Sequence, residues 1–288
     1  MEFFSENRRF CLRVDPDPER PHRPGYCLAT LYEGEQIIWS RYLINNLAPI
    51  SVFVADSGKY VITMDEWTSF GELPVVIYGE RGRLIRVHGK DSLGLEDDIM
   101  HIKITVSSFW WNEDAISFFA PEEERFFIRL HWGRWIVLDL RRGNLMREDK
   151  FIFRDDQREQ YRGEWKELVN YREAELARRA IRMLDSEEEP ERKTGALICG
   201  QEKLTEAIPQ LRKLLADPGW FQRGSGKTGT IVLYVRESAR EALEAMGERV
   251  DGVTTRLPVE GHLRCDRATG RFYVDFAGTQ GEGDLRGE

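Results

Sequence analysis

The sequence predicts an α+β protein in which an N-terminal antiparallel β meander packs on a C-terminal α-helical unit. Three observations lead to this fold class. The segment 1–150 consists of short runs rich in β-branched and aromatic residues, a pattern typical of strands. In 151–250 apolar residues recur at three- and four-residue steps, which is typical of amphipathic helices. The segment 251–288 returns to a hairpin pattern and ends in a polar, glycine-rich stretch that we expect to be flexible. These segments are the predicted domains.

The predicted strands of 1–150 are short and separated by turn residues. Examples are "FCLRV", "CLATLY", "YVITM", "PVVIY" and "WIVLDL". Glycines that suit tight turns lie between many of these runs, at Gly34, Gly58, Gly82 and Gly143. Short, evenly spaced strands joined by short turns predict an antiparallel arrangement.

An internal repeat refines this expectation. The stretch "SENRRFCLRVD" (5–15) matches "ADSGKYVITMD" (55–65) in its pattern, and "VVIYGERGRLIR" (75–86) matches "IVLDLRRGNLMR" (136–147). Self-similarity at roughly 50 to 60 residues is typical of propeller blades. About three such units fit the segment, whereas propellers usually close with at least four. The β domain is therefore predicted to be propeller-like, with about three blade-like units, and open.

Three helices are predicted after the β domain. They cover 157–184, 205–218 and 234–248, with the charged turn "DSEEEPE" after the first and the stretch "RKTGALICG" following it. The last helix places one apolar face at Val235, Ala239, Ala242, Leu243 and Met246.

The pair "AIPQLRKLLADP" and "VRESAREALEAMG" resembles a HEAT repeat. The residues that carry the resemblance are Ile208, Pro209, Leu211, Leu214, Leu215, Asp217, Val235, Arg236, Ala239, Ala242, Leu243 and Gly247. The segment 173–200 resembles a degenerate earlier repeat, so the resemblance covers about 173–248. It implies a stack of helix pairs, which buries its core between neighbouring repeats.

The strand half resembles uncharacterised bacterial propeller-like proteins. The stretch that carries this resemblance is "ADSGKYVITMDEW…PVVIYGERGRLIR". No activity comes with it, so it implies no catalytic residue.

The string "RGSGKTGT" (223–230) has the composition of a phosphate-binding loop. That motif requires a glycine five residues before Gly226, and this position is Phe221. It also requires a strand before the loop and a helix beginning at the lysine, so that helix amides meet the phosphates. The preceding segment reads as helix and the following "TIVLY" as extended. We therefore predict a long inter-helix loop, anchored at its base by Trp220, Phe221 and Tyr234.

The composition limits which classes of binding partner and which cellular location we expect for this protein. The formal net charge is −8 over 288 residues, which disfavours general binding to nucleic acid. No apolar run is long enough to span a membrane, and "MEFFSENRRF" lacks the features of a signal peptide. A cytoplasmic location is expected.

Metal and cofactor sites are not predicted. The histidines at positions 22, 88, 101, 131 and 262 lack metal-site spacing. The four cysteines are scattered, at Cys11, Cys27, Cys199 and Cys265, which favours reduced thiols, with a Cys11–Cys27 bridge left open. Cys199 is expected in the core.

Aromatic residues suggest where a partner binds. Trp110 and Trp111 are adjacent, so a strand would place them on opposite faces. Trp67 lies in "DEWTSFGELP", a connection that either covers a sheet edge or binds a ligand. Arg223 and Lys227 would form a basic tip on an acidic protein. The candidate partner-binding residues are Trp220, Phe221, Arg223, Lys227, Tyr234, Trp67 and Trp110.

These features together predict a non-enzymatic scaffold or adaptor of bacterial type that binds another protein. One alternative is a nucleotide-binding enzyme that uses Lys227 and Thr228. A second alternative is a small-ligand or glycan sensor that uses the β domain around Trp67.

Overall fold

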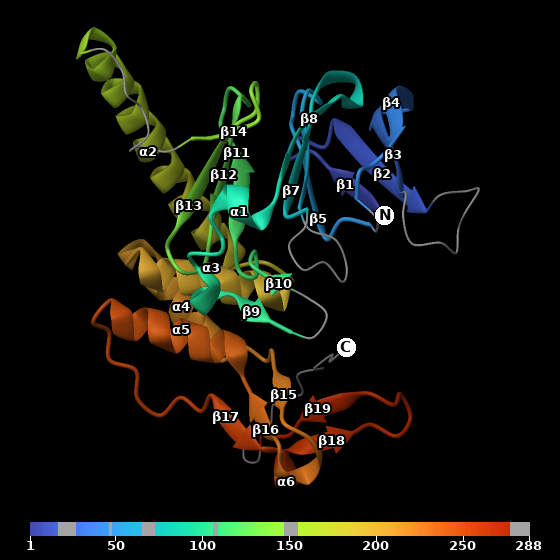
Figure 1. The fold of residues 1–288 in the computed structure, drawn as a ribbon. Helices are drawn as coiled ribbons and strands as arrows, with labels where there is room; N and C mark the ends of the chain where they lie inside the picture. Colours follow the sequence, from blue (N-terminus) through green and yellow to red (C-terminus); the bar gives the residue numbers. More distant parts are fainter. Residues whose placement is uncertain (17–26, 46–47, 65–72, 106–108, 147–154, 277–288) are drawn as a thin grey trace. The chain divides into compact units, whose positions relative to one another are not determined.

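The computed structural model describes residues 1–16, 27–45, 48–64, 73–105, 109–146 and 155–276 (Figure 1). The chain forms two compact units, Met1–Glu167 and Leu168–Glu288. The described part of the first unit is built mainly of antiparallel sheets, and helices dominate the second. The predicted α+β class is confirmed at this level.

Within its described residues, the first unit contains three four-stranded antiparallel sheets, and each is a meander of consecutive strands. The first sheet has β1 (Glu2–Phe4), β2 (Phe10–Pro16), β3 (Cys27–Glu33) and β4 (Gln36–Tyr42). The second has β5 (Ser51–Val54), β6 (Val61–Met64), β7 (Val75–Tyr78) and β8 (Leu84–His88). The third has β11 (Ile116–Phe119), β12 (Arg125–Arg129), β13 (Trp135–Asp139) and β14 (Asn144–Met146).

The turn glycines hold these meanders in register. Gly34, Gly58, Gly82 and Gly143 all have positive φ, between 58° and 69°, a conformation that residues with a side chain rarely adopt. The prediction that they form turns is confirmed. At Gly58 and Gly143 an added Cβ would also overlap a neighbouring side chain.

The sheets bury their apolar faces against one another. One cluster of buried residues joins the first sheet to the second, with Leu12, Leu31 and Trp39 against Val76 and Tyr78. Another joins the opposite face of the second sheet to the third, through residues such as Ile62, Ile77, Phe126, Ile128 and Leu138. Strands β6 and β7 are consequently buried along their whole length, as expected for a sheet covered on both faces.

Short elements connect the second and third sheets or lie at their ends. They are η1 (Glu80–Gly82), α1 (Lys90–Leu93), η2 (Ile99–His101), β9 (Lys103–Ile104) and β10 (Phe109–Trp110), the last two forming a two-stranded sheet.

The longer helices among the described residues are α2 (Asp155–Met183), α3 (Glu189–Gln201), α4 (Ile208–Leu214) and α5 (Tyr234–Ala245), and the 3₁₀ turn η3 (Thr205–Ala207) precedes α4. They match the three predicted helices closely and add α3, which the sequence showed only as an apolar stretch. Helices α3 and α5 pack side by side. The contact is close because a Cβ on Gly200 would lie 2.7 Å from the Cα of Ala242. The predicted face of α5 is buried at Val235, Ala239, Ala242 and Leu243.

The second unit also contains small sheets. β15 (Phe221–Arg223), β16 (Thr230–Val232) and β17 (Arg256–Pro258) form one antiparallel sheet, with η4 (Gly226–Thr228) between the first two strands. After α6 (Val259–His262), β18 (Leu263–Cys265) pairs with β19 (Phe272–Val274) as the hairpin that the sequence indicates, with Gly270 in its turn. The predicted flexible stretch 277–288 lies outside the described residues.

Candidate binding surfaces

The glycine-rich string joins two strands. Phe221–Arg223 pairs antiparallel with Thr230–Val232, so that Arg223 lies opposite Thr230. The prediction that this segment is a loop without secondary structure is therefore wrong. The segment does lie between α4 and α5, but it forms a hairpin that β17 extends to three strands. Three-residue strands such as these carry too little periodicity to be recognised in a polar, glycine-rich sequence.

The turn of this hairpin does not have the arrangement of a phosphate-binding loop. Gly224 and Gly226 have positive φ, and Gly226–Thr228 is a single 3₁₀ turn. The strand that follows is antiparallel to the strand that precedes it, and helix α5 begins only at Tyr234. The helix N-terminus that holds phosphate in such loops is therefore not at Lys227.

Nucleotide titration tests this interpretation. We expect no saturable binding of ATP or GTP in the presence of Mg²⁺, because the turn lacks a helix whose amides meet the phosphates. Isothermal titration of the wild type and of Lys227→Ala should give the same flat response. Magnesium-dependent binding that disappears in Lys227→Ala would instead support the nucleotide-binding alternative.

The structure brings several predicted site residues together at this hairpin. The rings of Phe221 and Tyr234 lie 5.8 Å apart, and the Phe221 side chain is half exposed. Trp220 packs against a small apolar cluster that includes Ile231 and Leu233. Arg223 is exposed at the end of β15. The side chain of Lys227 and all of Trp67 lie outside the described residues.

A buried ionic network lies just before the hairpin in the sequence, at Asp217 and Gly219, and includes Arg192 of α3. The Asp217 carboxylate accepts two hydrogen bonds from the Arg192 guanidinium, at 2.6 and 3.2 Å, and one from the Gly219 amide at 2.8 Å. The side chain of Asp217 is only 4% exposed. Desolvation lowers the pKa of Arg192, but the hydrogen bond and the charge of Asp217 outweigh it, so the pKa is raised. The network ties the start of α3 to the end of α4.

The Tyr234 hydroxyl belongs to the same region. It donates a hydrogen bond to Glu189 Oε2 at 2.8 Å. Burial and this carboxylate together raise the pKa of Tyr234, so the phenol is neutral at physiological pH. Tyr234 therefore joins two helices as well as supporting the Phe221 ring.

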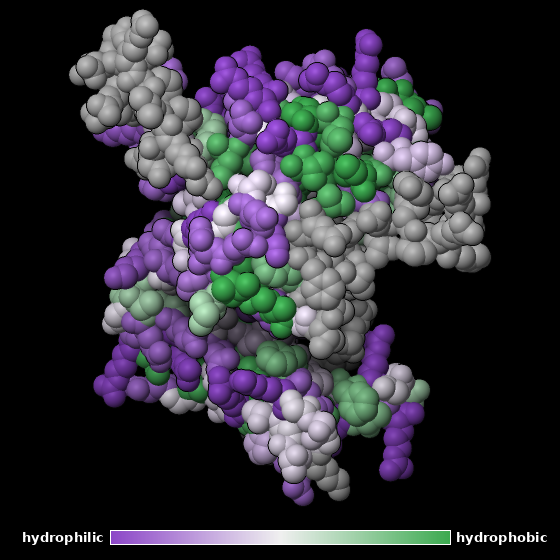
Figure 2. Space-filling view, in the orientation of Figure 1, coloured by the Kyte–Doolittle hydropathy of each residue, from purple (hydrophilic) through white to green (hydrophobic). Residues whose placement is uncertain are grey.

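Trp110 and Trp111 differ in exposure, but not by the predicted strand alternation, since β10 ends at Trp110 and Trp111 lies in the turn that follows. Trp111 is fully buried, whereas Trp110 is 37% exposed with Lys103 Nζ 5.6 Å from its ring centroid. Trp110 belongs to the first unit and to β10. Exposed apolar side chains lie near it in the sequence, at Ile99, Met100 and Ile104. Figure 2 shows hydrophobic surface over the part of this unit that holds β9 and β10 in Figure 1.

The outer face of the first sheet carries an apolar row that the sequence reasoning missed. Phe4 lies opposite Cys11, Cys11 opposite Tyr32, and Tyr32 opposite Ile37. Since residues directly opposite share a face, these four side chains cross all four strands as one line. Phe4 is 53% exposed and Ile37 is 57% exposed. In Figure 2 hydrophobic surface is visible along β4.

The sequence held a partial signal for this row. Alternation along β2 and β4 separates the two faces, but the opposite pairing of strands and the bulge between Leu31 and Tyr32 set which residues align. Neither can be derived from one strand alone.

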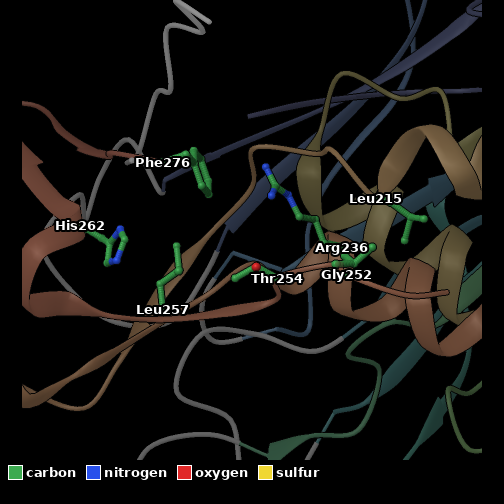
Figure 3. A pocket seen from close by; sticks show the side chains of 8 residues that line it. Leu215, Arg236, Gly252, Thr254, Leu257, His262 and Phe276 are labelled. Atoms are coloured by element: carbon green, nitrogen blue, oxygen red, sulfur yellow. The ribbon is translucent and has the colours of Figure 1, made fainter. Parts of the chain in front are cut away.

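A pocket of about 340 Å³ lies in the second unit (Figure 3). Its lining combines apolar side chains with one guanidinium, one hydroxyl and one imidazole, from Leu215, Arg236, Gly252, Val253, Thr254, Leu257, His262 and Phe276. The sequence does not predict a site here, because these residues come from six separate elements or connections.

The cysteines and the possible metal ligands form no further site among the described residues. Cys11, Cys27, Cys199 and Cys265 are all free thiols, so no bridge joins Cys11 to Cys27. Cys199 is fully buried, as predicted, and burial raises the pKa of its thiol to about 12. Among the described residues, no group of three or more His, Cys, Asp or Glu side chains gathers in a way that suits a metal ion. None of the described helices has the length and apolar character needed to cross a membrane.

Comparison with known proteins does not assign the chain to a family: no protein-family model matches the sequence, and no curated protein matches it significantly.

Proposed function

We propose that this chain is a non-enzymatic scaffold or adaptor that binds another protein on the outer face of its first sheet. The observation that carries the proposal is the apolar row Phe4–Cys11–Tyr32–Ile37, whose two ends are more than half exposed. Single exposed apolar side chains are common on protein surfaces, but an aligned group of them is typical of an interaction surface.

The stacking of the sheets supports this proposal. Each four-stranded meander has two faces. The first sheet packs on one face of the second sheet, and the third sheet packs on its other face. Among the described residues, the first sheet is covered in this way only on its inner face. We infer that the β domain is propeller-like and open, with three blade-like sheets, and that the partner packs on the first sheet as a further layer.

The helical unit fits the same kind of protein. In our proposal 173–248 forms two HEAT-like helix pairs, and the close packing of α3 on α5 at Gly200 and Ala242 is the contact between them. Stacks of repeats commonly serve as binding scaffolds. A cytoplasmic location and a bacterial type of adaptor remain predictions that go with this proposal.

The partner is expected to present an apolar surface framed by charges of both signs. Around the row, Arg9 pairs with Glu33 at 2.6 Å, and Arg13 pairs with Asp15 at 2.8 Å. These exposed ion pairs contribute little to stability. Their charges instead disfavour binding of the apolar row to surfaces that lack complementary charges.

Co-purification from the native host tests the proposal. We expect the wild-type chain to retain a stoichiometric protein partner and the double variant Phe4→Glu, Ile37→Glu to lose it. Both positions are exposed, so the double variant should keep the circular dichroism spectrum of the wild type. The matched control is Met100→Glu, which changes a 90% exposed apolar residue of the same unit and should retain the partner.

Two outcomes contradict the proposal. A clean monomer with no stoichiometric partner would count against a scaffold function. Equal loss of the partner in the double variant and in Met100→Glu would place binding elsewhere. Size-exclusion chromatography with light scattering separates a different protein from a second copy of this chain as the partner.

A further inference from the structure

The pocket around Arg236 has the features of a small-ligand site. Leu215, Val253, Leu257 and Phe276 give it apolar walls, while Arg236, Thr254 and His262 contribute polar groups. Figure 3 shows the Arg236 side chain extending toward the Phe276 ring, with Leu257 and Thr254 beside them. Its volume, about 340 Å³, lies near the lower end of the range for ligand pockets.

Arg236 is held in place before any ligand binds. Its Nε donates to the Asp217 carbonyl oxygen at 2.6 Å, and its Nη2 donates to the Ala216 carbonyl oxygen at 3.3 Å. The guanidinium lies over the Phe276 ring, 4.7 Å from its centroid. A guanidinium carries more N–H donors than these two carbonyls use. The Arg236 guanidinium therefore keeps N–H donors that could bind a ligand, and its orientation is already fixed before the ligand arrives.

Among the residues that the structure describes, the charge of Arg236 has no directly bonded counter-ion. The charge of Asp217 acts on Arg236, but both carboxylate oxygens of Asp217 bind Arg192, and one also accepts a hydrogen bond from the Gly219 amide. Among the described residues, no carboxylate bonds the Arg236 guanidinium. Burial lowers the pKa of Arg236, and the charge of Asp217 offsets this only in part. An anion in the pocket would relieve this unfavourable burial of charge.

We propose that this pocket binds a small apolar monocarboxylate, with its carboxylate on the Arg236 guanidinium and its apolar part against Phe276, Leu257 and Leu215. A planar guanidinium matches the geometry of a carboxylate. One arginine suits a single negative charge, and apolar walls disfavour the strongly hydrated, more highly charged phosphate ion. This inference is independent of the protein-binding surface, which lies in the other unit.

Isothermal titration of the full chain tests the proposal with three probes. Phenylacetate carries the charge and an apolar ring, phenylacetamide keeps the ring without the charge, and inorganic phosphate has charge alone. We expect saturable one-site binding of phenylacetate, at least about tenfold weaker binding of phenylacetamide, and no saturation with phosphate. Equal binding of phenylacetate and phenylacetamide, or no saturable binding of phenylacetate, overturns the proposal. Tighter binding of phosphate overturns the assignment to a monocarboxylate.

Two variants locate the binding. Arg236→Met removes the cation and should abolish the preference for phenylacetate over phenylacetamide. Arg236 also bonds two backbone carbonyls, so Arg236→Met could disturb the fold as well as the pocket. Thr254→Trp therefore provides a second test. Thr254 is exposed, so the larger side chain is expected to fill the pocket without removing a buried contact. The matched control is Arg240→Met, on the same helix one turn later and outside the pocket lining. Binding that survives Thr254→Trp, or that Arg240→Met weakens equally, contradicts the site.

Discussion

Replacing Asp217 by alanine is expected to destabilise the second unit by about 3 kcal/mol or more. The substitution leaves the Arg192 guanidinium largely buried, with a side chain 13% exposed, and without its carboxylate. It also removes the acceptor of the Gly219 amide. Removing one partner of a buried pair costs more than the pair itself contributes, because the remaining charge keeps its desolvation penalty. Urea unfolding followed by far-UV circular dichroism measures the effect.

Two further variants separate the charge from the shape of this side chain. Asp217→Asn keeps a hydrogen-bond acceptor and loses the charge, so its loss of stability should be smaller than that of Asp217→Ala. The control is Asp251→Ala, because Asp251 forms an ion pair with Arg249 in which both side chains are largely exposed. We expect a change of less than about 0.5 kcal/mol for this control. Similar values for Asp217→Ala and Asp251→Ala would contradict the buried network.

Replacing Phe126 by alanine is expected to destabilise the first unit by about 4 kcal/mol. Phe126 is fully buried between the second and third sheets. Its ring centroid lies 5.1 Å from that of Phe53 on β5 and 4.9 Å from that of Phe119 on β11, both in edge-on geometry. Truncation removes these aromatic contacts and leaves a cavity that the neighbouring sheets cannot close.

The matched control for Phe126→Ala is Phe4→Ala, which removes the same side chain from an exposed position. It should change stability by less than about 0.5 kcal/mol. Phe126→Leu, which keeps most of the volume, should cost less than about 1.5 kcal/mol. A loss for Phe126→Ala as small as that for Phe4→Ala would mean that the two sheets do not pack on each other through this ring.

The fold could be predicted where the chain carries a regular pattern. Turn glycines such as Gly34 and Gly143 stand between strongly apolar strands, and the 3.6-residue periodicity of Val235, Ala239 and Leu243 marks a helix on its own. Each pattern is local, so one sequence is sufficient to recognise it. Alternation does not explain the different exposure of Trp110 and Trp111, because β10 ends at Trp110 and Trp111 lies in the turn that follows.

The candidate sites could be predicted less well because they depend on contacts between distant residues. The pairing of Phe221 with Val232 makes a hairpin out of a string that reads as a loop. In the sequence Arg236 stands out only as part of a repeat pattern, and its place in a pocket depends on Leu257 and Phe276, which lie far along the chain. The row from Phe4 to Ile37 likewise needs the register of four strands.

Within the part of the chain that the structure describes, every strand in the three four-stranded sheets pairs only with strands that are its neighbours in the sequence. Each sheet can therefore assemble from a continuous stretch of polypeptide, without waiting for a distant segment. Low contact order of this kind favours rapid folding. It also allows the sheets to form one after another as the polypeptide leaves the ribosome, which shortens the time for which their apolar faces are open to aggregation.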